Sequence, residues 1–155
     1  MGAGPLPGLE ERLVTHYLVV AHKTLIGEHL LAEAQKRMDQ GPSEVHLVVP
    51  VTHPVGAWSQ GSVDATARER LSEGLEAFRA IGATADGMIG DVSPPTAVED
   101  ALRAHRNAGL EIDEIILSTL PPGPSRWLKL DVLSRVHERT DLPVTHLVAE
   151  RSASI

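Results

Sequence analysis

The sequence predicts a single α/β domain built on a doubly wound, five-stranded parallel sheet with helices on both faces. Five short segments are rich in apolar residues, and the most continuous of them are typical of strands covered on both faces. Segments with helical periodicity separate them in strict alternation, as parallel neighbours require. A chain of 155 residues is also long enough to bury one core without disulfides or metals.

Local patterns place the elements. The expected strands cover residues 16–21, 45–49, 84–89, 114–118 and 144–148, and the expected helices cover 26–40, 63–81, 94–107 and 125–140. In the first helix, Leu30, Ala34 and Met38 recur at spacing four, so one stripe faces the sheet. Ser93 followed by Pro94 is typical of a helix start. The third strand is only weakly hydrophobic, which favours an edge position.

The ends of the chain differ in composition from its middle. Residues 1–13 are rich in Gly and Pro and predict a flexible arm, residues 14–150 form the one domain, and 151–155 form a flexible tail. The connection 51–62 is long for an α/β unit and predicts either a functional flap or irregular chain. Within it, Trp58 is placed either to cover a site or to pack against a neighbour.

Composition excludes several classes of function. The formal net charge is -7 and no Lys/Arg cluster is present, so we expect no nucleic-acid partner. No apolar run approaches the roughly 20 residues that span a bilayer, and the first residues do not resemble a signal peptide, so we expect no membrane association. Without Cys there is neither a disulfide nor a thiol nucleophile. The cytoplasm is the expected compartment.

Three stretches carry a resemblance to a known family: GDVSPPTAVEDAL at 90–102, DEIILST at 113–119 and DLPVTHLV at 141–148. Together with the alternation of elements over roughly residues 15–150, they resemble the universal stress proteins. The resemblance implies a sheet order of 3-2-1-4-5 and ATP or AMP bound between the first and fourth strands. It also implies a homodimer joined through the last strand, with Val144 and Leu147 as candidate residues of the dimer seam.

The resemblance does not extend to the phosphate-binding loop. With Pro143 on the family's proline before the last strand, the Gly-x2-Gly-x9-Gly-Ser/Thr motif falls on Leu117, Leu120, Leu130 and Asp131. Glycines let backbone amides approach a phosphate closely, which leucine side chains oppose. Prolines around Gly123, the one glycine there, remove further N–H donors. The sequence therefore predicts a divergent member with a degenerate nucleotide site.

Ligands of doubly wound sheets lie beyond the carboxyl ends of the strands, where the strand order reverses. The candidate nucleotide or anion site consists of Ala21, His22, Lys23, Gly90, Asp91, Ser118, Thr119, Gly123, Ser125 and Arg126. Hydroxyl groups, a helix N-terminus and Arg126 would hold the negative groups of a small phosphate-bearing ligand. The competing interpretation is that the Ser and Thr residues only cap strand and helix ends.

Other chemistry finds less support in the sequence. His22, His53 and Asp91 follow expected strands and could converge on a metal, but no His pair has HxH or HxxxH spacing on a helix, so we expect no metal site. His16, His46 and His146 are expected to be structural. No Gly-x-Ser-x-Gly elbow is present, so we expect no catalytic residues. Two hypotheses remain: a non-catalytic dimeric module that senses a small ligand, and an adenine-nucleotide binder with slow ATP hydrolysis.

Overall fold

The computed structural model describes residues 14–21, 27–51, 60–91, 93–119 and 132–148. The elements are β1 (Thr15–Val20), α2 (Glu28–Gln40), β2 (Ser43–Pro50), α3 (Gln60–Ala80), β3 (Thr84–Gly90), α4 (Pro94–Asn107), β4 (Glu114–Thr119), α6 (Val132–Arg139) and β5 (Val144–Val148). The expected arm 1–13, the tail 151–155 and most of the connection 51–62 lie outside the described residues.

The five strands form one sheet in the order β3-β2-β1-β4-β5, and every neighbouring pair is parallel. β1 is central, with Val20 aligned to Val48 of β2 on one side and to Leu117 of β4 on the other. The predicted fold class and strand order are both confirmed. β3 lies at one edge, as its weak hydrophobicity indicated.

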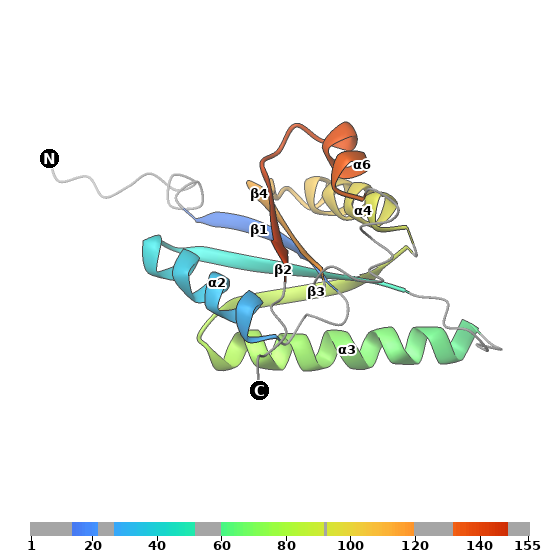
Figure 1. Cartoon of the computed structure of the whole chain (residues 1–155), viewed down its shortest axis with the longest axis horizontal. Coiled ribbons are helices and arrows are strands. Elements are labelled where there is room, and N and C mark those ends of the chain that lie inside the picture. The colour runs from blue at the N-terminus through green and yellow to red at the C-terminus, as the bar shows by residue number, and fades with distance from the viewer. Residues whose placement is uncertain (1–13, 22–26, 52–59, 92, 120–131, 149–155) are drawn as a thin grey trace, which may run out of the picture.

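Helices cover both faces of the sheet (Figure 1). On one face α2 and α3 pack over alternate strand residues such as Val19, Leu47 and Ile116. On the other face α4 and α6 pack over Leu18 and its neighbours of the opposite parity. Successive side chains of a strand point to opposite faces, so a continuous apolar run supplies both cores at once.

The sequence predicted the start of α4 correctly but placed the start of α3 too late. Ser93 caps α4 as predicted, because its Oγ accepts a hydrogen bond from the N–H of Thr96 and Pro94 occupies the first helical position. α3 begins at Gln60 rather than at the predicted residue 63, so the connection before it is shorter than expected. Apolar periodicity cannot detect a polar first turn, which explains that difference.

A partly buried ion pair ties α2 to the far half of the sheet. Arg37 of α2 forms ion pairs with Glu33 and with Glu114 of β4, and it also lies within hydrogen-bond distance of Thr145 of β5. Burial by itself would lower the pKa of Arg37, but the hydrogen bonds to Glu114 and Glu33 outweigh it and raise the pKa. These contacts hold α2 against β4 and β5, which lie beyond the point where the strand order reverses.

Within the described ranges, no helix is both long enough and apolar enough to cross a bilayer.

His146 of β5 provides a pH test of this packing. Burial lowers its pKa from the ordinary value of 6.5, so the folded protein favours the neutral ring. The corresponding stability is fully present above pH 6.5 and is lost as the pH falls from there towards the lower folded-state pKa, because the unfolded chain binds the proton first. Urea denaturation at several pH values should show that the free energy of unfolding falls less steeply with decreasing pH in His146→Gln than in the unmodified protein. The exposed His29→Gln is the control, and an identical slope in both variants would contradict this assignment.

Candidate functional site

The predicted site begins where β1 and β4 end side by side. Val20 and Leu117 are paired in register, so Ala21 and Ser118 follow them as neighbours at the same edge of the sheet. Both are almost fully buried, and the N–H of Ala21 donates to the carbonyl of Val48 at 3.3 Å. We call this place, Ala21 with Ser118 and the backbone of Thr119, the β1–β4 rim. The predicted proximity of Ala21 and Ser118 in parallel strands is therefore confirmed, and the ligand cleft expected between them stays a prediction.

Half of the candidate residues lie outside the described part of the chain. They are His22, Lys23, Gly123, Ser125 and Arg126, together with the side chain of Thr119. Their convergence on the rim stays a prediction. The structure does show where the two segments that carry these residues begin. Segment 22–26 follows Ala21 at the end of β1, and segment 120–131 follows Thr119 at the end of β4.

Gly90 and Asp91 lie at the same edge of the sheet but not beside the rim. Gly90 is aligned with Pro50 of β2, and β2 separates β3 from β1. A Cβ on Gly90 would lie 2.7 Å from the Cβ of Ala97 and 2.9 Å from Cγ1 of Val48. Asp91 accepts a hydrogen bond from the N–H of Ser93 at 2.9 Å through Oδ1. The close approach of α4 explains the glycine, and the turn before α4 explains the aspartate.

Substitution of Gly90 tests that structural explanation. Gly90→Ala should lower the free energy of unfolding by about 1–3 kcal/mol, because the added methyl group forces α4 away from β2 and β3. Chemical denaturation measures the change. Gly41→Ala is the matched control, since nothing lies within 4 Å of a Cβ at that position. Equal stability of the two variants would show that the helix yields without cost.

A second group of polar side chains gathers at the opposite, amino-terminal end of the strands. It consists of His16 on β1, Glu44 and His46 on β2, Asp86 on β3 and His105 near the end of α4, and we call it the histidine cluster. Sheet register brings it together: His16 is aligned with Glu44, and His46 with Asp86. All four strand residues share the parity of Leu18 and Val48, so they face α4.

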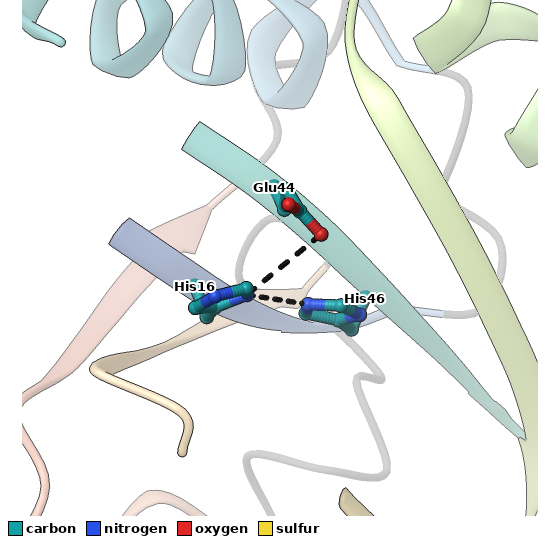
Figure 2. Close-up of side chains that lie close together, drawn as sticks. All are labelled: His16, Glu44 and His46. Atoms are coloured by element: carbon teal, nitrogen blue, oxygen red, sulfur yellow. Dashed lines mark hydrogen bonds and ion pairs between the residues drawn. The ribbon is translucent and has the colours of Figure 1, made fainter. Parts of the chain in front are cut away.

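The rings of the histidine cluster are in close contact. His16 Nδ1 lies 3.0 Å from His46 Nε2, and His46 Nδ1 lies 2.7 Å from Oδ1 of Asp86. Figure 2 shows the two rings with Glu44, whose Oε1 is 4.0 Å from His16 Nδ1. The ring of His105 is tilted over that of His46, with centroids 4.7 Å apart. His46 itself is 1% exposed.

The surroundings favour an uncharged ring at His105. Burial lowers the pKa of His105, and repulsion by His46 and His16 lowers it further, while attraction to Asp86 opposes the change. A neutral imidazole keeps one lone pair, which can accept a proton or bind a metal. Two triads have ligand atoms within 4.8 Å of one another: His16 with Glu44 and His46, and His46 with Asp86 and His105.

The histidine cluster has no HxH or HxxxH spacing on one helix, which is the sequence pattern that would have predicted it. The cluster instead draws on three neighbouring strands and one helix, so its members are far apart in sequence. Successive side chains of a strand alternate between the two faces of the sheet. Once the register is known, this alternation places His16, His46 and Asp86 on a single face. Two members of the group weighed in the sequence as possible metal ligands, His22 and His53, lie outside the described residues, and the third is Asp91.

The order β3-β2-β1-β4-β5 defines a doubly wound α/β protein whose ligand crevice is expected at the β1–β4 rim. No protein-family model and no curated protein sequence matches the chain. Solved structures do match, and those described below are universal stress proteins. The chain therefore has the fold of the universal stress proteins.

Three of these structures illustrate the likeness. The universal stress protein from Archaeoglobus fulgidus has a TM-score of 0.60 at 17% identity, over 91% of this chain and 98% of that one. A structure from the same organism in complex with dAMP has a TM-score of 0.56 at 18% identity, over 86% and 96%. A family protein from Arabidopsis thaliana with AMP bound has a TM-score of 0.60 at 10% identity, over 91% and 95%. Identities this low show the shared fold alone.

Proposed function

We propose that this protein is a non-catalytic module of the universal stress protein type, which senses a small phosphate-bearing ligand at the β1–β4 rim and acts as a cytoplasmic homodimer. The observation that carries the proposal is the strand order, which places the reversal of the sheet between β1 and β4. Two proteins with this fold were solved with dAMP and AMP. Adenine nucleotides are accordingly the first ligands to test.

The small side chains at the rim support this proposal. Ala21 lies on the α2 and α3 face of the sheet, and Ser118 shares the parity of Ile116 on that same face. Small side chains at both strand ends leave room for a ligand to approach the backbone. In the proposed site, Gly123, Ser125 and Arg126 supply anion contacts from the segment after β4, and His22 and Lys23 supply them from the segment after β1.

The same rim supports a degenerate nucleotide site. In the alignment on Pro143, the family's first glycine corresponds to Leu117, which is 1% exposed and packs in the core beneath α4 and α6. β4 runs on to Thr119, so the strand occupies positions where the family motif starts its glycine loop. The groups expected at the rim bind anions, and we assign them no catalytic step. Slow ATP hydrolysis remains the alternative.

Thermal unfolding with AMP or ATP, each with and without Mg²⁺, tests the ligand proposal. A nucleotide present at 100 times its Kd should add about 2.7 kcal/mol to the stability of the folded state. The double variant Ser125→Ala with Arg126→Ala should lose that effect, while the exposed Arg103→Ala on α4 should keep it. Unchanged melting with every nucleotide would reject adenine-nucleotide sensing. Steady release of phosphate from ATP would favour the hydrolytic alternative.

The proposed dimer rests on the position of β5. Among the described strands, β5 is paired with β4 alone, and we propose that a second copy pairs with its outer edge. Val144 packs against the core beneath α4 and α6, and Leu147 packs against the opposite core. Both side chains are only partly buried. They therefore belong to the fold of one chain and can also contribute to a seam.

Charge on β5 should separate the copies. Leu147→Arg should convert the dimer into a monomer in sedimentation equilibrium, because two like charges would face each other across the seam. Val144→Arg should act in the same way. Circular dichroism must show that each variant keeps its fold, since both residues touch a core. Thr84→Arg, exposed on the opposite edge strand β3, is the control. A monomeric unmodified protein would refute the dimer.

A further inference from the structure

We propose that His16, Glu44 and His46 bind a divalent transition-metal ion, with zinc as the preferred metal, at the amino-terminal ends of β1 and β2. The site lies at the opposite end of the strands from the β1–β4 rim, so it does not depend on the proposed function. Two imidazoles and a carboxylate are a ligand set that zinc accepts, with a further position open to water. Imidazole nitrogen also suits copper and nickel, which sets the range of ions to compare.

The atoms that would hold the ion already face one another (Figure 2). Nδ1 of His16 and Nε2 of His46 are 3.0 Å apart. Two nitrogens bound to one tetrahedral zinc ion at about 2.0 Å lie about 3.3 Å apart, so a movement of a few tenths of an ångström suffices. Oε1 of Glu44 lies 4.0 Å from His16 Nδ1 on a side chain that is 37% exposed, so the carboxylate has the freedom to close on the ion.

Asp86 is a positioning residue for this site. Its Oδ1 lies 2.7 Å from Nδ1 of His46, a normal length for an N–H···O hydrogen bond. An imidazole that donates Nδ1–H to a carboxylate presents its Nε2 lone pair, and here that lone pair points to His16. In the alternative triad of His46, Asp86 and His105, the Asp86 carboxylate is already the hydrogen-bond partner of His46 Nδ1. The short contact to Asp86 therefore favours the triad that contains His16.

Access and charge agree with this assignment. The side chain of His16 is 14% exposed, so an ion can reach the site from solvent although His46 is covered. A positive charge on His105 would be repelled by His46 and His16. Without an ion, a single proton shared between His16 and His46 satisfies both facing nitrogens. Metal binding would displace that proton, as it does when imidazole ligands give up protons to bind.

Calorimetric titration of Zn²⁺ into the tag-free, chelator-treated full chain tests the proposal. We expect about one ion per chain with a Kd in the micromolar range or tighter. His16→Gln should weaken binding at least about tenfold, as should Glu44→Gln, since each removes one ligand from a three-ligand set. Asp86→Asn should weaken it by about 10- to 100-fold, the effect typical of lost support for a metal-bound histidine. His29→Gln, on an exposed position of α2, is the matched control.

Two further measurements separate metal binding from a structural role. The melting temperature of each variant without metal shows whether the fold survives, and Asp86 tolerates change because its side chain is 65% exposed. Visible absorption of added Co²⁺ reports nitrogen coordination in the unmodified chain and its loss in His16→Gln. No Zn²⁺ binding by the unmodified protein would overturn the proposal. Binding that is equally strong in folded His16→Gln would overturn it too, because the ion would then be held elsewhere.

Discussion

The parallel pairing of β1 with both β2 and β4 is the constraint on which the rest of this structure depends. Leu18, Val19 and Val20 are at most 1% exposed, so β1 must be covered by helices on both faces as well as by strands on both sides. The chain adds β2 and β3 on one side of β1, and α4 then carries it to the other side, where β4 and β5 follow. That reversal produces the β1–β4 rim and sends α2 and α3 to one face, α4 and α6 to the other (Figure 1).

The two ends of the sheet carry different chemistry for a physical reason. At the carboxyl ends of β1 and β4 the chain has the small residues Ala21 and Ser118, which are almost fully buried. At the amino ends, the returning helix α4 places His105 over His46, so side chains rather than backbone fill the region. The first end is where we propose an anionic ligand, held by backbone and hydroxyl groups. The second suits a cation held by lone pairs.

The surroundings of Gly90 and His46 were not predicted by the sequence. Gly90 was a candidate for ligand contact on sequence grounds, and the structure explains it through the approach of Ala97 instead. His46 was expected to be structural, yet it lies between two other imidazoles and a carboxylate. Neither outcome could be obtained from local patterns, because both depend on which helix or strand lies opposite. The two strand ends, Ala21 and Ser118, are neighbours as predicted, and the ligand site beside them stays a prediction.

Local sequence determined the order and kind of the elements, because apolar runs, helical periodicity and the Ser93 cap act over a few residues. It also indicated that β3 would be an edge strand, since few apolar residues are available there to be covered. Tertiary structure alone decided the register that aligns His16 with Glu44 and His46 with Asp86. The register depends on how both faces of the sheet pack against their helices at the same time. A short stretch of sequence contains one strand but not the strands and helices it packs against, so it cannot specify the register.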